Sequence, residues 1–189
     1  IVNNELVKIE KLIIEGAWIA KSPLLTDNRG YFREWFSLEE ISSALDIAFD
    51  VKQANMSSSK KGVIRGIHYS IVEEGQSKWV TCVSGLIWDV VVDLRPNSPT
   101  FKSWLGVYLS PSTGDSLLIS EGLGHGFVSL EENSEIVYLL NSPYSPSKEF
   151  AIHPLDPDLG IDWPIQNIVL SNRDSTAPSF REQLESGKL

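Results

Sequence analysis

The chain has 189 residues and a mass of 21.1 kDa, with 42% hydrophobic and 22% charged residues. This size fits one domain that can bury a sizeable core, and the composition excludes a disordered or collagen-like chain. The formal net charge of −9 argues against a non-specific nucleic-acid binder, which normally carries the opposite charge.

Most of the chain predicts short β-strands. Runs rich in β-branched and aromatic residues alternate with turns rich in Gly, Pro, Asn and Ser, and this spacing favours a sandwich or barrel over a βαβ protein. The expected strands span 11–20, 31–36, 51–56, 63–70, 79–94, 101–109, 117–120, 126–130 and 136–140.

Two helices are expected, each beginning with a capping box in which a serine and a glutamate satisfy each other's backbone donors. These boxes are Ser37–Glu40 and Ser179–Glu182, and the second helix should end near Gly187. No linker divides residues 1–189, so we expect a single domain. Its Pro- and Asp-rich segment from about residue 143 should wrap the body.

The alternation within 88–93 places Asp89 and Asp93 on the same face of a strand, amid apolar neighbours. Such a face lines a wet cavity or lies on the outer, solvated side of the sheet. The residues alone leave both interpretations open.

Two of the three histidines lie in unusual contexts. By strand alternation His68 faces away from Arg65, unless Gly66 marks a bulge that re-aims one of them. Three glycines surround His125, which allows close approach of the backbone or unusual dihedral angles around it. The alternative is a tight turn with a buried, hydrogen-bonded imidazole.

No metal ion or cofactor is expected. A two-histidine strand site needs His-x-His, but the residue two after His68 is Ser70. His68, His125 and His153 could still converge in the fold, although nothing in their spacing indicates it. The chain has neither a Walker- or Rossmann-type glycine loop nor a serine nucleophile elbow. Cys82, the sole cysteine, excludes an internal disulfide and is expected to be buried rather than reactive.

The chain has no stretch of about 20 apolar residues and no signal-peptide pattern at its start, so we expect a cytoplasmic protein without a membrane span. Cationic side chains gather near the histidine segments, and in an acidic chain this local excess fits an anionic small ligand. Solvated loops are the alternative, preferred for Lys60 and Lys61 but not for Arg65. The cations are Arg29, Arg33, Lys52, Lys60, Lys61, Arg65 and Lys78.

An ordered series of motifs, from Asp27 to about Phe180, resembles the dTDP-4-dehydrorhamnose 3,5-epimerases and related dTDP-keto-sugar epimerases. Each motif is weak alone, but the series in this order is specific. The motifs are Asp27-x-Arg29-Gly30-x-Phe32-x-Glu34, Gln53-x-Asn55-x-Ser57, Gly62-Val63-Ile64-Arg65-Gly66-Ile67-His68-Tyr69, Gln76-x-Lys78-x-Val80, Gly85-x-Ile87-x-Asp89-Val90-x-Val92-Asp93-Leu94-Arg95, Ser98-Pro99-Thr100-Phe101, Glu121-Gly122-Leu123-Gly124-His125-Gly126-Phe127, Tyr138, Tyr144, Asp162-Trp163-Pro164 and Leu170-Ser171-x-x-Asp174.

The resemblance implies an all-β, cupin-type jelly roll (a double-stranded β-helix) with a few short helices, forming a homodimer that exchanges N-terminal strands without a metal. It implies an isomerase that epimerises a dTDP-4-keto-6-deoxyhexose in deoxysugar biosynthesis, the pathway type of dTDP-rhamnose and antibiotic sugars. A C4 ketone makes the C3 and C5 protons acidic, so such an enzyme needs a base near neutral pH, a donor at the enolate oxygen and a second proton donor.

Roles follow from the same resemblance. His68 corresponds to the base, oriented by Asp174, Tyr138 to the acid on the other face of the sugar, and Lys78 to the group that steadies the enolate. Phe32 corresponds to a thymine-stacking residue that reaches into the partner subunit. The remaining matched positions are the nucleotide and diphosphate contacts Arg29, Glu34, Gln53, Asn55 and Arg65, and the site-lining residues Asp89, His125 and Tyr144.

Inversion at both C3 and C5 is the leading interpretation, with inversion at one centre of a modified dTDP-keto sugar close behind. A dTDP-keto-sugar isomerase that moves the ketone is an alternative on the same fold. A non-catalytic sugar-nucleotide-binding cupin and a metal-dependent cupin oxygenase are alternatives from other classes.

Overall fold

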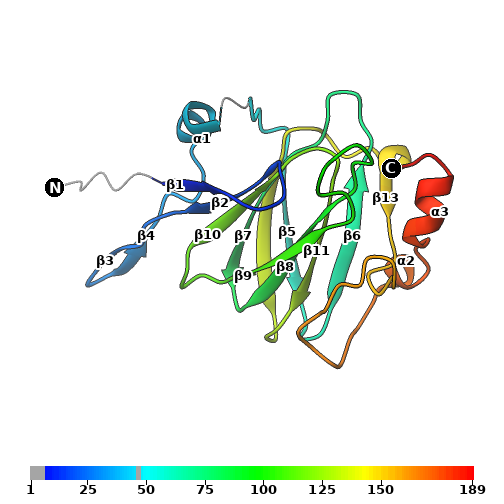
Figure 1. The fold of residues 1–189 in the computed structure, drawn as a ribbon. Helices are drawn as coiled ribbons and strands as arrows, with labels where there is room; N and C mark the ends of the chain where they lie inside the picture. Colours follow the sequence, from blue (N-terminus) through cyan, green and yellow to red (C-terminus); the bar gives the residue numbers. More distant parts are fainter. Residues whose placement is uncertain (1–6, 46–47) are drawn as a thin grey trace.

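The structure, a computed structural model, describes residues 7–45 and 48–189. Within them the chain folds as two large antiparallel sheets and one two-stranded sheet, which confirms the all-β jelly roll expected from the sequence (Figure 1). The six-stranded sheet has the order β1 (Lys8–Lys11), β2 (Ala17–Lys21), β10 (Asp115–Ile119), β7 (Lys78–Ser84), β12 (Ser134–Leu140), β5 (Gln53–Ser59). The five-stranded sheet has the order β13 (Glu149–Ala151), β6 (Ile64–Ser70), β11 (Leu123–Ser129), β8 (Ile87–Asp93), β9 (Trp104–Leu109).

Four short helices complete the fold: α1 (Leu38–Leu45), the 3₁₀-helix η1 (Pro146–Lys148), α2 (Asn172–Ser175) and α3 (Phe180–Glu185). The capping box of α3 is complete, and Gly187 follows the helix at φ 67°, as expected. At α1 the Ser37 hydroxyl accepts the backbone N–H of Glu40 at 3.4 Å. The helix α2 was not anticipated from the sequence.

Several expected strands have different bounds. The single strand expected over 79–94 is two strands, β7 and β8, because Gly85 turns the chain at φ 73°, where an added Cβ would lie 2.6 Å from the Ser134 hydroxyl. The strand expected over 11–20 divides in the same way at Gly16, with φ 87°. The strand expected over 101–109 begins only at Trp104, because residues 95–103 form turns held by Asp93.

The main core lies between the two sheets. Alternate residues of each strand point inward, so apolar side chains from β2, β7 and β10 meet those from β8, β9 and β11. The buried set comprises Ile14, Ala17, Ile19, Val80, Cys82, Ile87, Val91, Leu109, Leu117, Ile119, Leu123, Phe127 and Ile136.

The outer faces of both sheets are also covered. The chain after residue 150 crosses the five-stranded sheet, where Trp163 and Phe180 join a second core cluster with Trp88 and Ile67. The ring of Trp163 packs edge-on against Trp88 at a centroid distance of 5.5 Å. Ile41 of α1 covers the six-stranded sheet in a third cluster. These coverings leave the space between the sheets open at one end.

A two-stranded hairpin, β3 (Leu25–Asp27) and β4 (Gly30–Phe32), projects from the body (Figure 1). Its turn is the predicted 27–30 segment, but β4 ends at Phe32 rather than continuing to residue 36. Phe32 and Tyr31 are 66% and 58% exposed. No helix in the two described ranges is long and apolar enough to cross a membrane.

Candidate active site

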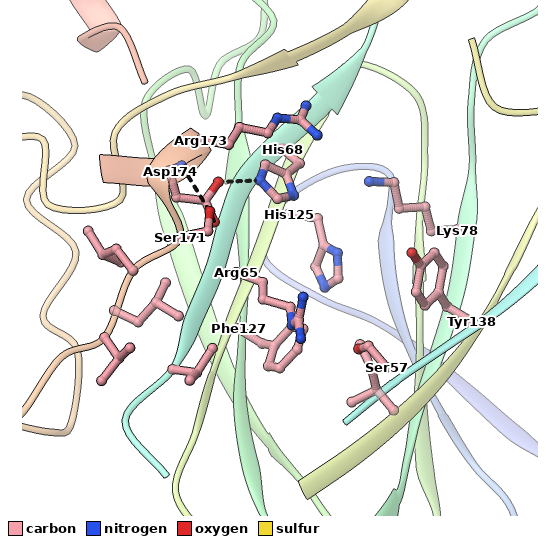
Figure 2. A pocket seen from close by; sticks show the side chains of 15 residues that line it. Ser57, Arg65, His68, Lys78, His125, Phe127, Tyr138, Ser171, Arg173 and Asp174 are labelled. Carbon is pink, nitrogen blue, oxygen red and sulfur yellow. Dashed lines mark hydrogen bonds and ion pairs between the residues drawn. The ribbon is translucent and has the colours of Figure 1, made fainter. Parts of the chain in front are cut away.

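A cavity of about 520 Å³ opens between the two sheets. Strands β6 and β11 form one wall, β5, β7 and β12 form the other, and the 169–174 segment closes one side (Figure 2). The lining residues are Ser57, Val63, Ile64, Arg65, His68, Lys78, His125, Phe127, Ile136, Tyr138, Val169, Leu170, Ser171, Arg173 and Asp174.

A bulge in β6 brings Arg65 and His68 to the same cavity. Strand β11 pairs His125 with His68 and Phe127 with Arg65, so β6 contains one extra residue between the two pairs. Gly66 lies in this bulge at φ 144°, and an added Cβ would meet the Gly126 Cα at 2.5 Å. The conditional expectation of a bulge at Gly66 is therefore correct, and glycine is required there by both dihedral and space.

His68 forms a hydrogen-bonded pair with Asp174. Its Nε2 lies 2.6 Å from Asp174 Oδ1, while the other carboxylate oxygen accepts the Ser171 hydroxyl at 3.0 Å. Ser171 is the N-cap of α2 and also accepts the backbone N–H of Asp174, which fixes the carboxylate at the cavity edge. Because a carboxylate only accepts, Nε2 carries the proton and Nδ1 of a neutral imidazole keeps its lone pair.

The environment keeps this imidazole neutral. Burial lowers the pKa of His68, and the nearby charges of Lys78 and Arg173 lower it further, which together outweigh the raising effect of Asp174. Burial acts to raise the pKa of Asp174, but its hydrogen bond and charge interaction with His68 hold that pKa below its ordinary value. The carboxylate partner of the histidine is therefore only one part of the balance that sets its pKa.

His125 belongs to a second histidine–carboxylate pair. Its Nε2 lies 2.9 Å from both carboxylate oxygens of Asp89, which is fully buried behind the imidazole. Asp93 lies further along the strand, away from the cavity, and accepts hydrogen bonds from Arg95, Ser98 and Thr100. The solvated-face interpretation of the two aspartates is therefore wrong, and only Asp89 stands next to the cavity.

Lys78 and Tyr138 lie on the opposite wall from His68 (Figure 2). They come from adjacent strands, β7 and β12, where Tyr138 pairs with Val80, two residues along from Lys78. Burial lowers the pKa of Lys78, while the negative charges of Glu149 and Asp89 act to raise it. The cavity therefore places the imidazole of His68 on one side and the side chains of Lys78 and Tyr138 on the other.

Two polar residues of the cavity, Arg173 and Ser57, were given no role from the sequence. Arg173 lies beside Asp174 on α2 and adds a third cation to Arg65 and Lys78. The hydroxyl of Ser57 is buried without a hydrogen-bond partner among the described residues. Ser171-x-x-Asp174 matches a helix-start pattern, which could have located α2 and hence Arg173.

Of the thirteen predicted site residues, the structure brings six to this cavity: His68, Asp174, Tyr138, Lys78, Arg65 and His125. Gln53 and Asn55 lie on β5, two residues apart and joined by a 2.9 Å hydrogen bond, next to Ser57 on the same face. Tyr144 is 54% exposed, and its backbone N–H donates to Gln53 Oε1 at 2.8 Å.

Three other predicted site residues lie outside the cavity of this single chain. Arg29 and Phe32 are on the projecting hairpin, and Glu34 follows it. Arg29 is exposed and pairs with Asp27 at 2.5 Å. Lys60 and Lys61 are exposed and do not line the cavity, as their solvated-loop interpretation predicts.

In the part of the chain that the structure describes, no group of three His, Cys, Asp or Glu side chains has the arrangement of a metal site. Cys82 is fully buried, as expected, and burial raises the pKa of its thiol to about 11. A neutral, enclosed thiol is a poor nucleophile.

Residues 11–182 match the family model described as dTDP-4-dehydrorhamnose 3,5-epimerase. The chain belongs to this family. A dTDP-4-dehydrorhamnose 3,5-epimerase of Mycolicibacterium smegmatis is 44% identical over 180 residues, covering 95% of this chain and 89% of that protein. The family assignment agrees with the fold and with the histidine, lysine and tyrosine gathered in the cavity.

Solved structures agree. A 4-keto-6-deoxy sugar epimerase from the novobiocin gene cluster of Streptomyces spheroides superposes with a TM-score of 0.95 at 39% identity, covering 100% of this chain and 95% of that one. A 3′-monoepimerase from Streptomyces bikiniensis, in complex with dTDP-quinovose, has a TM-score of 0.91 at 41% identity, covering 94% and 90%. Members that resemble this chain closely therefore include single-centre epimerases.

Proposed function

We propose that this protein inverts C3 and C5 of a dTDP-4-keto-6-deoxyhexose through an enolate. The observation that carries the proposal is the cavity itself. A neutral His68, backed by Asp174, faces a space whose opposite wall holds Lys78 and Tyr138. Base and acid on opposite sides of one cavity are what inversion requires, because a base alone returns the proton to the face it left.

The steps assign one task to each group. Nδ1 of His68 takes the proton from carbon next to the ketone, and the electron pair of that C–H bond moves to the C4 oxygen. Lys78, as an ammonium, donates to the resulting enolate oxygen. Tyr138 then delivers its proton to the opposite face of the carbon, and solvent restores the protonation of both residues between turnovers.

The nucleotide portion has a cationic place to bind. Arg65 is anchored by its own donations to the Ser59 hydroxyl at 3.0 Å and the Ser58 carbonyl at 3.1 Å. Arg173 lies at the same cavity. Two guanidinium groups in an otherwise acidic chain suit the diphosphate of a dTDP-sugar, since arginine binds phosphate oxygens in a bidentate manner.

The projecting hairpin supports a homodimer in which each subunit completes the other's site. Phe32 exposes an aromatic ring outside the cavity of its own chain, with Arg29 on the same hairpin and Glu34 two residues after it. In a dimer these residues reach the partner's nucleotide. Mixing His68→Ala with Phe32→Ala protein tests this exchange, because a mixed dimer contains one site with both residues intact. Recovered activity supports the dimer, and two inactive parents that stay inactive after subunit exchange contradict it.

Single-centre epimerisation is the second candidate, because the 41% identical Streptomyces bikiniensis protein is a 3′-monoepimerase. Incubation with dTDP-4-keto-6-deoxyglucose in deuterated water decides between them. Deuterium at C3 and C5 supports the proposal, and deuterium at one carbon supports the second candidate. Label at neither carbon, with dTDP bound in calorimetry, would indicate a non-catalytic sugar-nucleotide-binding protein.

A further inference from the structure

Gln76 is a buried polar residue near the cavity that the proposed mechanism does not use. It stands two positions before Lys78, is only 6% exposed, and donates from Nε2 to the Ser142 hydroxyl at 3.0 Å and to Glu149 Oε1 at 3.4 Å. Buried amide groups are almost always hydrogen-bonded, because a buried donor that loses its acceptor is desolvated without compensation and destabilises the fold. One amide nitrogen thus holds a hydroxyl and a carboxylate.

These bonds join the two walls of the cavity. Gln76 leads into β7 of the six-stranded sheet, whereas Glu149 begins β13 of the five-stranded sheet. Strand β13 pairs directly with β6, where Ala151 is opposite His68 and Glu149 is opposite Ser70. The contact therefore connects the strand that carries Lys78 to the neighbour of the strand that carries His68.

The carboxylate that Gln76 holds also acts on Lys78. Lys78 has no ion-pair partner in residues 7–45 and 48–189. Among the charges around it, Glu149 and Asp89 act to raise its pKa, whereas burial and Arg173 lower it. His68 and Tyr138 line the same cavity.

We infer that Gln76 is a positioning residue: it holds the Glu149 carboxylate of one cavity wall against the start of the strand that carries Lys78, and it sets the separation of the two walls. This inference rests on the proposed function for its catalytic consequence, because Lys78 serves the enolate only as an ammonium. Its effect on the pH at which Lys78 loses its proton can be measured without turnover.

The test compares two buried glutamines. Gln76→Met keeps the size and removes the donor. Gln183→Met is the matched control, because Gln183 is 4% exposed and donates to the Ala151 carbonyl of the same strand β13 at 2.9 Å, from the outer face. A small amine-reactive reagent modifies only the neutral amine of Lys78. Mass spectrometry measures the extent of this modification at each pH, which gives the midpoint of Lys78 deprotonation.

In Gln76→Met the Lys78 midpoint should move to lower pH, because a loosened carboxylate no longer opposes burial. The alkaline limb of kcat should move the same way, and kcat should fall about 10-fold, within the loss that a misplacement of about 1 Å produces. Gln183→Met should leave the Lys78 midpoint and the pH profile unchanged. An unmoved midpoint in Gln76→Met, or an equal shift in the control, overturns the inference.

Glu149→Gln keeps the inference testable if Gln76→Met does not fold. It leaves the Gln76 amide in place and removes the charge, so it should also lower the Lys78 midpoint, and adding Gln76→Met to it should cause no further shift. Additive shifts would show that the two residues act separately and would refute the coupling. If the unmodified protein fails to exchange deuterium into any dTDP-keto sugar, the proposed function fails while the Lys78 result stands by itself.

Discussion

Replacing Asp174 by Asn probes the tautomer of His68 with almost no change in shape. The carboxylate has a fixed place, 2.6 Å from Nε2 of His68 and 3.0 Å from the hydroxyl of Ser171. If the Ser171 hydroxyl keeps donating to the amide oxygen of Asn, the amide nitrogen faces His68. Nε2 must then accept, and the ring proton moves to Nδ1, which removes the lone pair from the cavity.

Two effects set the size of the loss. Loss of a general base costs about 10²–10⁴ in rate, and a histidine held in the wrong tautomer falls at the upper end of that range. If the amide instead rotates to accept from His68, only the charge assistance is lost, which is about 1.5–3 kcal/mol or roughly 10–100-fold. We expect kcat to fall at least 10-fold and up to about 10⁴-fold.

The pH profile has a definite sign. Asp174 acts to raise the pKa of His68, so its removal lowers that pKa further. The base works only as neutral imidazole, and activity appears as pH rises through its pKa. The acid limb of kcat should therefore move to lower pH in Asp174→Asn, although the plateau is lower.

Deuterium exchange from solvent into the substrate, quenched at fixed times and measured from pH 4 to 9, gives both the loss of rate and the position of the acid limb. Asp156→Asn is the matched control: Asp156 is another buried carboxylate of the C-terminal segment, but its partners are backbone N–H groups, including that of Phe180 at 3.0 Å. An exchange rate within about threefold of the parent, or an acid limb that stays in place, would falsify the role assigned to the His68–Asp174 pair.

Three further substitutions have distinct expected outcomes. Tyr138→Phe should leave deuterium exchange by His68 largely intact while net inversion falls much further, and equal losses would instead mean a role in binding. Arg65→Ala should weaken dTDP binding by about 1.5–3 kcal/mol in calorimetry, and unchanged affinity would remove Arg65 from the diphosphate site. Burial acts to raise the pKa of Asp93, but hydrogen bonds from Arg95 and two hydroxyls lower it to about 2. The ionised carboxylate therefore stabilises the fold fully above its unfolded pKa of about 3.9, and this stabilisation is lost as the pH falls towards 2. Asp93→Asn should cost on the order of 2 kcal/mol at pH 7 in urea unfolding, and the cost should shrink towards pH 2.

Strand alternation predicted the fold class but not every side-chain direction. The sequence places His68 and Arg65 three residues apart, which by alternation puts them on opposite faces. The structure puts them on the same face because β6 has an extra residue opposite 125–127. Gly66 indicated that a bulge was possible, yet only the pairing with β11 decides it, and that pairing is non-local.

The segment that carries Asp174 shows a different limit. A four-residue helix has too little hydrophobic periodicity to be recognised, so α2 was not expected. Its position is set by the Ser171 cap and by the parallel bridge between Val63 and Val169. The resemblance supplied Asp174, whereas Arg173 became apparent only when the segment was seen to close the cavity.

Arg29, Phe32 and Glu34 show why one chain is insufficient. Motif order selected them for nucleotide binding, yet they lie on or just after a hairpin that projects from the body (Figure 1), and they do not line the cavity of their own chain. Intrachain contacts do not explain an exposed phenylalanine at the end of β4, since a single hairpin buries little apolar surface. Their assignment depends on the proposed dimer and stays a prediction.

The choice between the two imidazoles follows from their surroundings rather than from their partners. His68 and His125 are opposite each other on neighbouring strands, and each has a carboxylate at Nε2. The side chain of His68 is 28% exposed and that of His125 is 10% exposed. The base of an epimerase must release the proton that it has taken before the next turnover. The more exposed imidazole of His68 exchanges a proton with solvent more readily than the enclosed imidazole of His125. His68 also has its pKa lowered by burial and two nearby cations, so it is neutral before substrate arrives. His125, enclosed against the fully buried Asp89, is better suited to hold the sugar than to move its protons.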